Sequence, residues 1–496
     1  MIGLHESLLY NRIRTRLNSK AYISYAQVPA SISNQEKTIK DKLKNSWKHQ
    51  NSIDHYIQAS TQWHNYLELL KKDYPKYYKM RFATIEEPMD KLQQHIPKNT
   101  SVVRYLFAED ALYAVTITQK EKHIFKLSTK NLQNHIAKMA ENKPDIFAIN
   151  NSLYELYQQL WKPFETKITT ENVIIIPDGA LFNLSFETLT PKKIYSFKEL
   201  ATNSLLVKHT ISYNYSLLLL DENKKTIHFK NDFIAFAPEF NDKMKKDYRI
   251  AITDSVTADK TYLSLLPQPF SVDLALEYSR LFNGKSFINE KASKQIFKNE
   301  AAEHKIIHIG THAESNNISP ELSRLIFAKN TKNEDNSLYT YEIYNENLNS
   351  NLAILTACET GKPTYQAGEG MISLAHAFNY AGSESILTSL WKIDEQSSAK
   401  IVELFYQNIK KGWPKNKALQ QAKRDYLATA EGRTLHPQYW AGMILIGNTA
   451  PIDLQTPTSI LWYLLMATCA ILLVFFVVKT RKRVAISSNS STLKNE

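Results

Sequence analysis

The sequence predicts an α/β protein with a mostly parallel sheet flanked by helices and preceded by a helical segment. Three short apolar runs, 306–309, 352–355 and 385–390, indicate buried strands, because parallel strands covered on both faces are apolar along their whole length. Stretches with helical periodicity alternate with apolar runs, which is typical of a sheet with helices on both faces. The 496 residues are too many for one compact core, so we expect more than one domain.

The composition excludes several classes of function. The net charge of +12 is spread over many lysines rather than massed in one block, so we expect no nucleic-acid partner. Twelve glycines are few for this length and argue against a Gly-rich phosphate loop. Only two cysteines are present, Cys358 and Cys469, and the second lies in an apolar run near the C-terminus. The remainder of the chain therefore has neither an internal disulfide nor a cysteine-based zinc cluster, and we expect no metal or other cofactor.

Residues 1–98 are predicted to be helical. Tyr56, Trp63, Leu67 and Leu70 recur at steps of three, four and seven, which places them on one face of a helix with polar residues opposite. Nothing in this segment suggests catalysis. We expect it to pack against, or bind, a protein partner.

From residue 99 to residue 450 the pattern is that of strands and helices in alternation. The expected strands are 102–107 and 112–118, which form a hairpin, then 123–127, 173–176, 233–237 and 440–446 in addition to the three runs above. The expected helices include one around Leu153 to Trp161, one at 272–282, one at 397–411 and one at 415–429. A turn at Pro177-Asp178-Gly179 ends the strand 173–176.

The C-terminal part reads as a linker at 451–458, a transmembrane helix at 459–478 and a basic, polar tail at 479–496. The stretch 459–478 has no charge and matches the roughly 20 residues that cross a bilayer. Trp462 and Tyr463 at one end and four basic residues at the other suit the two interfaces. We therefore expect a single-pass membrane protein. Its sidedness stays open, because the basic tail favours an external large domain while no signal peptide precedes it.

Two potentially reactive side chains each follow an apolar run. His312 lies just beyond 306–309 and Cys358 just beyond 352–355. Reactive groups in open α/β sheets gather at the carboxyl ends of strands, so we expect these two to face each other. A cysteine hydrolase needs a thiol nucleophile, an imidazole base and backbone N–H groups for the oxyanion. The N–H groups of Ala313 and Cys358 are the natural oxyanion donors.

The separation of 358 − 312 = 46 residues, histidine first, also suits a caspase-type peptidase. Other readings stay open: Cys358 as a core residue, His312 as a loop cap, or His308 as the base. His308 lies inside its strand, so we expect it to face the core or a helix with a hydrogen bond. His376, in a helical stretch, is expected to be structural. No Gly-x-Ser-x-Gly elbow suggests a serine nucleophile.

Five blocks of sequence resemble successive motifs of the CHAT domain, the caspase-like module found in bacteria after tetratricopeptide repeats and related to separase and caspases. They are Pro177–Leu189, His308–Ala313, Thr356–Gly361, Gly368–Glu395 and His436–Gly447. Tyr74–Phe82 and the helices before it resemble the segment that joins such repeats to the module. The resemblance implies a caspase-like fold over 99–450 and a His312–Cys358 dyad. Ala313 departs from the family, which usually has Gly there, and a positive φ at that position would strain it.

Separase-like relatives place an acidic residue just after a Leu-Trp pair to accept a basic P1 side chain, and here LWKIDE offers Asp394 and Glu395. A helix N-cap is an equally good reading of these acids. Together the patterns predict a membrane-anchored, caspase-like cysteine endopeptidase that acts on a peptide or protein through an acyl-enzyme and is regulated through its helical N-terminal part. The alternatives are an inactive scaffold of the same fold and a thiol hydrolase or acyltransferase with a small substrate.

Overall fold

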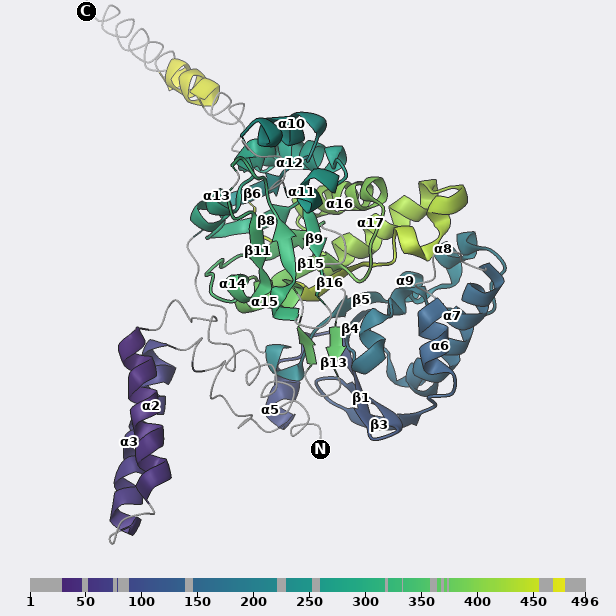
Figure 1. Cartoon of the computed structure of the whole chain (residues 1–496). Helices are drawn as coiled ribbons and strands as arrows, with labels where there is room; N and C mark the ends of the chain where they lie inside the picture. Colours follow the sequence, from purple (N-terminus) through teal and green to yellow (C-terminus); the bar gives the residue numbers. More distant parts are fainter. Residues whose placement is uncertain are drawn as a thin grey trace, which may run out of the picture. The chain divides into compact units, whose positions relative to one another are not determined.

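The structure is a computed structural model of the chain (Figure 1). It describes residues 29–46, 52–74, 78, 89–138, 146–220, 229–251, 259–316, 320–331, 333–356, 364–366, 370–372, 374–454 and 467–477. The chain divides into two compact units, Met1–Asp453 and Leu454–Glu496, and the architecture below is that of the first.

One large sheet forms the centre of the first unit. Among the described residues it contains eleven strands in the order β3-β2-β1-β4-β5-β16-β15-β12-β8-β6-β7. In chain order these are β1 (Thr100–Ala108), β2 (Ala111–Ile117), β3 (Lys122–Leu127), β4 (Asn172–Ile176), β5 (Thr210–Tyr213), β6 (Asn231–Ala237), β7 (Lys285–Ile288), β8 (His304–Ile309), β12 (Leu352–Leu355), β15 (Ser385–Ser389) and β16 (Met443–Gly447). A smaller sheet joins β9 (His312–Glu314), β10 (Arg324–Ile326) and β11 (Ser337–Tyr339), and β13 (Thr364–Gln366) pairs with β14 (Gly370–Ile372).

The large sheet has two halves whose strands run in opposite directions, and each half is parallel except at the β3 edge, where β2 pairs antiparallel with both β1 and β3. Strands β1, β4, β5 and β16 are parallel to one another, and so are β15, β12, β8, β6 and β7. The halves meet where β15 pairs antiparallel with β16, with Ser385 opposite Gly447 and Ser389 opposite Met443. The carboxyl ends of the two halves therefore lie on opposite edges of one continuous sheet.

Apolar side chains cover both faces of the first half. On one face, Tyr105 of β1 stacks on Phe186 and donates a hydrogen bond to the carbonyl of Leu160, the last residue of α7 (Ile146–Leu160). On the other face, Val102 and Ile174 pack against Leu92 of α5 (Met89–Gln94). Burial on both faces explains why the strands of this half read as continuous apolar runs.

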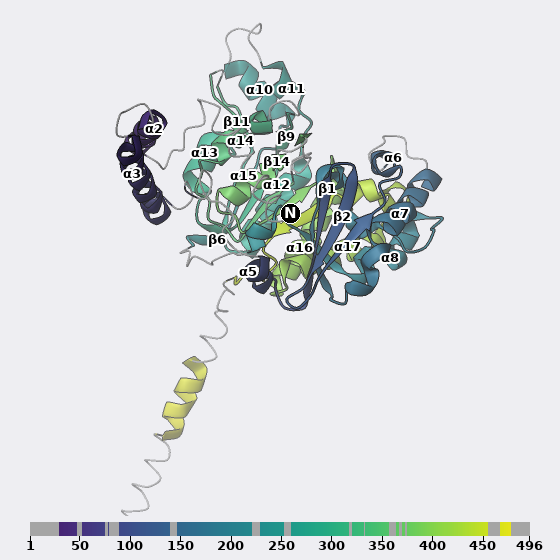
Figure 2. The same ribbon diagram turned by 90° about the horizontal axis from the view of Figure 1, so that it is seen from below.

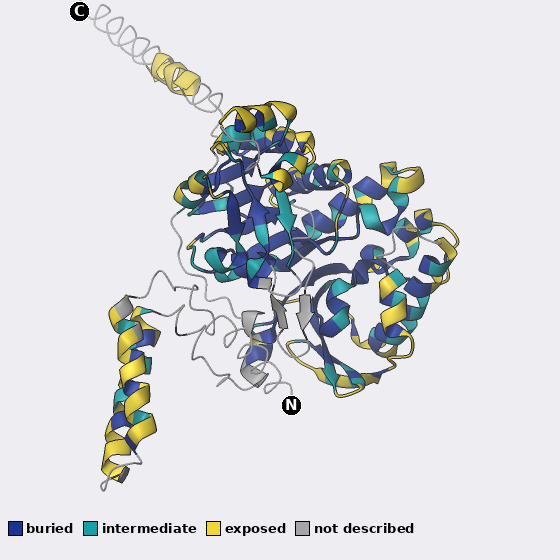
Figure 3. Ribbon diagram, in the orientation of Figure 1, coloured by how far each residue is buried: buried dark blue, intermediate teal, exposed yellow. Residues whose placement is uncertain are grey.

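The second half is covered in the same way. On one face, the rings of Phe233 and His308 lie against Tyr406 of α16 (Glu395–Lys410), which packs against α12 (Pro269–Leu281). On the other face, Phe236 packs on Phe297 of α13 (Lys294–Glu300), and Phe297 contacts Phe378 of α15 (Leu374–Tyr380). Figures 1 and 2 show α6 and α7 beside the first half and α13 and α15 beside the second. Figure 3 shows buried residues concentrated in the central strands.

The remaining helices complete these layers. They are α6 (Leu132–Lys138), α8 (Leu200–Asn203), α9 (Leu205–Lys208), α10 (Asp242–Ala251), α11 (Lys260–Ser264), α14 (Thr340–Ile343) and α17 (Lys415–Thr429), with short 3-10 turns between them. Nearer the N-terminus, α2 (Ala30–Asn45) and α3 (Ser52–Asp73) pack on each other through Ile39, Tyr66 and Leu70. The helical character expected for this segment is thus confirmed where it is described.

The transmembrane helix expected at 459–478 is a wrong prediction, and with it the single-pass membrane localisation. In the part of the chain that the structure describes, no helix combines the length and the apolar character needed to cross a bilayer. Inside the expected span, helix is described over 467–477.

Candidate active site

His312 is the first residue of β9 and follows the buried strand β8 after a two-residue turn. Gly310 in that turn donates its N–H to the carbonyl of Phe236, 3.0 Å away. A Cβ on Gly310 would lie 2.8 Å from the Cβ of Ser271, so the turn passes α12 at a distance that only glycine permits. The chain then pairs with β10, with His312 opposite Ile326.

The environment of the His312 ring favours a neutral imidazole. Its Nε2 donates to the carbonyl of Leu266 at 2.8 Å, which leaves Nδ1 as the nitrogen that carries the lone pair. The ring also lies 5.2 Å from that of Phe240. Burial lowers the pKa of His312; the charges of Lys392 and Lys245 act in the same direction, while the bond to Leu266 and the charge of Glu314 oppose it. Such a ring can accept a proton through Nδ1 near neutral pH.

Ala313 adopts an ordinary strand conformation. It lies in β9 opposite Leu325, packs against the main core, and does not have a positive φ. The strain that an alanine would suffer at a left-handed position is therefore not present here. Whether its N–H serves an oxyanion stays a prediction.

The strand that precedes Cys358 lies directly beside the one that precedes His312. β12 is parallel to β8, with Leu355 opposite Ile309, and the N–H of Thr356 donates to the carbonyl of Ile309 at 3.2 Å. Adjacent strands are about 4.8 Å apart. Cys358 itself lies outside the residues that the structure describes.

His308 and His376, the two further histidines considered for the site, have structural roles, as expected. His308 is fully buried and its Nδ1 lies 2.8 Å from the hydroxyl of Tyr406 on α16. His376 is buried on α15, with its Nδ1 2.6 Å from the hydroxyl of Tyr344. Burial lowers the pKa of each imidazole to about 4, so both stay neutral in the core.

Asp394 and Glu395 each accept hydrogen bonds from the N-terminal turn of a helix, α16 and α12 respectively. Oδ1 of Asp394 accepts from the N–H and the hydroxyl of Ser397, at 3.0 and 2.9 Å, and so caps α16. Oε1 of Glu395 accepts from the N–H of Ser271 at 3.1 Å, in the first turn of α12. Burial raises the pKa of Glu395, against the effect of that bond. Asp394 is exposed, so capping leaves it accessible to a ligand; its role toward a substrate stays a prediction.

The segment 266–271 connects these residues, and sequence reasoning missed it. Its start accepts the bond from His312, and its end donates the bond to Glu395. The side chains of Leu266 and Phe270 are exposed by 67% and 39% although both are large and apolar. The only signal in the sequence is the run Leu265-Leu266-Pro267-Gln268-Pro269-Phe270, whose first proline indicates an extended turn and whose second suits the first position of a helix.

A cavity of about 410 Å³ adjoins this segment between α12, α16 and α17. Phe270 and Asp394 are on its wall together with the carboxylates of Asp273, Glu277 and Glu403, while Lys400 and Arg433 contribute the cations. Acids thus outnumber bases around it. Within the described residues, no group of three His, Cys, Asp or Glu side chains is arranged to hold a metal ion.

Comparison of the sequence with models of known protein families identifies the CHAT-domain family. The sequence model of the CHAT domain matches residues 150–448, which is more than half of the chain. Tetratricopeptide repeat protein 28 of Homo sapiens is 31% identical over 93 residues, 19% of this chain and 4% of that protein. Its Mus musculus counterpart is 22% identical over 232 residues, 39% of this chain and 9% of that protein. The chain therefore spans less than a tenth of the length of either relative.

Among solved structures, the separase–securin complex of Saccharomyces cerevisiae covers 81% of this chain and 34% of its own, with 10% identity and a TM-score of 0.46. The complex of the pro- and mature domains of RgpB from Porphyromonas gingivalis covers 67% of this chain and 80% of its own, with 11% identity and a TM-score of 0.35.

Proposed function

Because the chain belongs to the CHAT-domain family, we propose that it is a cysteine endopeptidase in which His312 and Cys358 form the catalytic dyad. The observation that carries the proposal is the pairing of the two strands that lead to these residues. Ile309 and Leu355 are direct partners at the ends of β8 and β12. His312 and Cys358 each follow three residues later in the sequence. Equal sequence separations from the ends of neighbouring parallel strands favour a short distance between imidazole and thiol.

The state of His312 suits the role of base. With Nε2 held by the Leu266 carbonyl, Nδ1 accepts the proton of the Cys358 thiol. The thiolate attacks the peptide carbonyl carbon, and the tetrahedral oxyanion takes hydrogen bonds from the N–H groups of Ala313 and Cys358. The intermediate collapses as His312 returns the proton to the leaving amine. Water, deprotonated by His312, then hydrolyses the acyl-enzyme.

The substrate is a peptide or protein, and we propose a basic residue at P1. Asp394 is exposed at the start of α16 and belongs to a cavity wall with more carboxylates than cations, which favours Arg or Lys side chains. Glu395 supports this wall through its bond to the start of α12. The helices α2 and α3 are proposed to bind a protein partner that regulates the activity.

The test is covalent labelling with peptidyl electrophiles that carry a basic, an acidic or an apolar P1 residue. We expect labelling of the wild type, strongest with a basic P1, and loss of labelling in Cys358→Ala. His312→Ala should slow labelling and peptide hydrolysis by roughly 10²- to 10⁴-fold. Cys469→Ser and His123→Ala serve as matched controls and should behave like the wild type.

Three outcomes would overturn the proposal in different ways. Absence of labelling with every P1 residue, together with full biological function of Cys358→Ala, would identify an inactive scaffold. Hydrolysis of simple thioesters but not of peptides would identify a small-substrate thiol hydrolase. Equal labelling of wild type and His312→Ala would remove the histidine from the dyad.

A further inference from the structure

The strand that carries His312 is short, and its position depends on its neighbours. β9 has three residues, and side chains two apart in a strand point to the same face, so His312 and Glu314 share one face. Their direct partners on β10 are Ile326 and Arg324. The next strand, β11, pairs Tyr339 with Arg324 and Ser337 with Ile326.

The guanidinium of Arg324 spans the three strands. Its Nε and Nη2 both donate to Oε2 of Glu314, at 2.9 and 2.7 Å, and its Nη1 donates to the hydroxyl of Ser337 at 2.9 Å. An isolated surface ion pair contributes little, because two long side chains must be ordered in water. Here the planar guanidinium has three fixed bonds, and its side chain is only 27% exposed.

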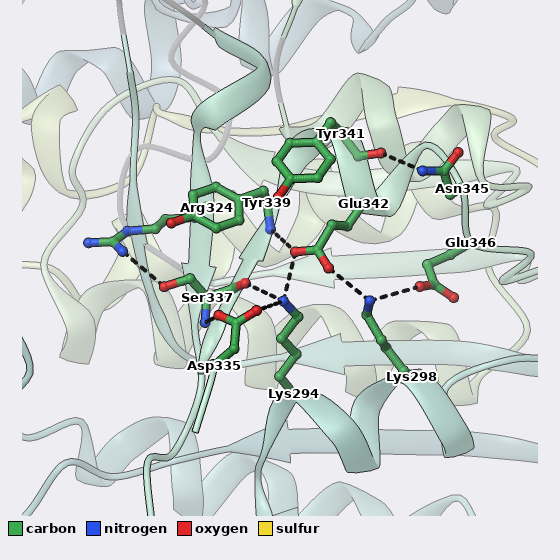
Figure 4. A network of polar contacts seen from close by, with 10 residues as sticks. All are labelled: Lys294, Lys298, Arg324, Asp335, Ser337, Tyr339, Tyr341, Glu342, Asn345 and Glu346. Atoms are coloured by element: carbon green, nitrogen blue, oxygen red, sulfur yellow. Dashed lines mark hydrogen bonds and ion pairs between the residues drawn. The ribbon is translucent and has the colours of Figure 1, made fainter. Parts of the chain in front are cut away.

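Ser337, the far partner of Arg324, is itself fixed to the body of the protein. Its carbonyl accepts from Nζ of Lys294, the first residue of α13, at 2.8 Å. The same ammonium contacts the carboxylates of Asp335 and Glu342, and Lys298, one turn further along α13, also reaches Glu342. Figure 4 shows these cations rising from α13 beneath β11 and α14, with Arg324 on the other side of Ser337. A chain of contacts thus runs from α13 through β11 and Arg324 to Glu314.

We propose that Arg324 is a positioning residue for His312. By binding Glu314 and Ser337 together, it fixes β9 against a frame anchored on α13 and so sets the orientation of the His312 imidazole. The proposal rests on the function proposed above. Within the described residues Arg324 makes no contact with His312 itself, so its effect on the reaction is indirect.

Arg324 also balances charge next to the imidazole. The charged groups that act on His312 are Lys245, Lys392 and Glu314, with the uncharged Leu266 carbonyl and Phe240 ring completing its surroundings. Glu314 favours the imidazolium, and Arg324 neutralises that carboxylate. Loss of Arg324 should therefore raise the pKa of His312, and loss of Glu314 should lower it.

The experiment compares Arg324→Gln, Arg324→Lys, Glu314→Gln and the double variant Glu314→Gln/Arg324→Gln in a Cys469→Ser background. Two readouts are measured on the full chain: steady-state peptide hydrolysis, and the pH dependence of Cys358 alkylation by iodoacetamide, which needs no peptidase activity. Arg280→Gln, which removes an exposed guanidinium of α12, is the matched control.

For Arg324→Gln we expect kcat to fall roughly 10- to 100-fold with KM changed less than about twofold, since misplacement of a catalytic group affects the chemical step. The acidic limb should move to higher pH by roughly 0.5 to 1 pH unit, both in the pH profile of peptide hydrolysis and in that of Cys358 alkylation. Glu314→Gln should move it to lower pH, and the double variant should return it to the wild-type position with kcat still reduced. Arg324→Lys keeps the charge, so it should keep the pH profile and recover only part of kcat.

The two proposals fail separately. If the rate and pH dependence of Cys358 alkylation are the same in His312→Ala as in the wild type, the dyad itself is overturned. Alkylation that responds to His312→Ala but has wild-type rate and pH dependence in Arg324→Gln overturns the positioning role alone. A parallel fall in melting temperature, kcat and KM with an unchanged pH profile would also overturn it, because that is the result of a purely structural role.

Discussion

Replacement of Lys423 by methionine should destabilise the protein strongly, because it breaks a buried ion pair. Lys423 on α17 and Glu187, in the 3-10 turn Phe186–Thr188, contact each other with side chains 0% and 3% exposed. Burial raises the pKa of Glu187 and lowers that of Lys423, and each partner opposes the shift of the other. Methionine keeps the apolar stem and the volume but removes the cation, so the carboxylate is left in the core.

The expected cost is about 3–5 kcal/mol in the free energy of unfolding, the range for a buried pair that loses one partner. At roughly 2 °C per kcal/mol for a large domain, the melting temperature should fall by about 6–10 °C. The double variant Lys423→Met/Glu187→Leu should recover most of that loss, because well-packed apolar side chains replace a buried pair at little cost. Lys417→Met is the control: it removes an ion pair with Glu171 from the same helix, but that pair is exposed and should contribute less than about 1 kcal/mol.

The effect of Lys423→Met should depend on pH. Without the cation the pKa of Glu187 rises further above its unfolded value of about 4.3. A carboxyl with a raised folded pKa favours folding most below its unfolded pKa, and loses that contribution as pH rises through the folded pKa. The difference in melting temperature from the wild type should therefore be smaller at pH 5 than at pH 8, as measured by differential scanning calorimetry. A difference that is equal at both pH values, or no larger than that of Lys417→Met, would refute the reasoning.

The other predictions concern the candidate site. Gly310→Ala would place a Cβ 2.8 Å from that of Ser271, so we expect a loss of about 1–3 kcal/mol in stability and a fall in kcat; an unchanged melting temperature would contradict the close approach. Lys294→Met removes the cation between Asp335 and Glu342 and should cost about 1–3 kcal/mol, measured by thermal unfolding, because Glu342 keeps Lys298 as a partner and Asp335 is exposed; a change below about 1 kcal/mol would show that the network is not needed. Because burial lowers the pKa of His312, kcat/KM for peptide hydrolysis should fall only below pH of about 6.5, and a limb above pH 7 would contradict a neutral base.

The elements predicted best were the buried ones, because burial requires apolar residues at regular positions that can be recognised in the sequence. The run 352–355 is buried at every position, and it became β12 with the expected bounds. The hairpin of β1 and β2 was also predicted, and so were α16 and α17. The mostly parallel α/β architecture is confirmed. The opposite direction of the two halves could not be predicted, because strand direction depends on the connections through space and not on the apolar pattern.

The missed strands are short or lack an apolar pattern. β9 is His-Ala-Glu and β10 is Arg-Leu-Ile, three residues each, which is too few for any periodicity to appear.

For the site, the sequence placed His312 at a strand end, but the Leu266 carbonyl that accepts the hydrogen bond from its ring is a backbone group 46 residues away and leaves no trace in the pattern of side chains. The prediction at 459–478 rested mainly on the lack of charge, whereas among the described residues no helix is long and apolar enough to cross a bilayer.

The insertion of β16 between β15 and β5 connects the part of the first unit before residue 221 with the part after residue 229. β5 comes from the part of the chain before residue 221 and β16 from its last strand, and α17 adds Gln420, whose side chain accepts from Thr210 and donates to the carbonyls of Leu206 and His209. A protease that cuts between residues 220 and 229 would therefore produce two fragments that stay associated. Separately expressed pieces ending and beginning there should likewise reassemble on mixing, which offers a split-protein format for studying this molecule.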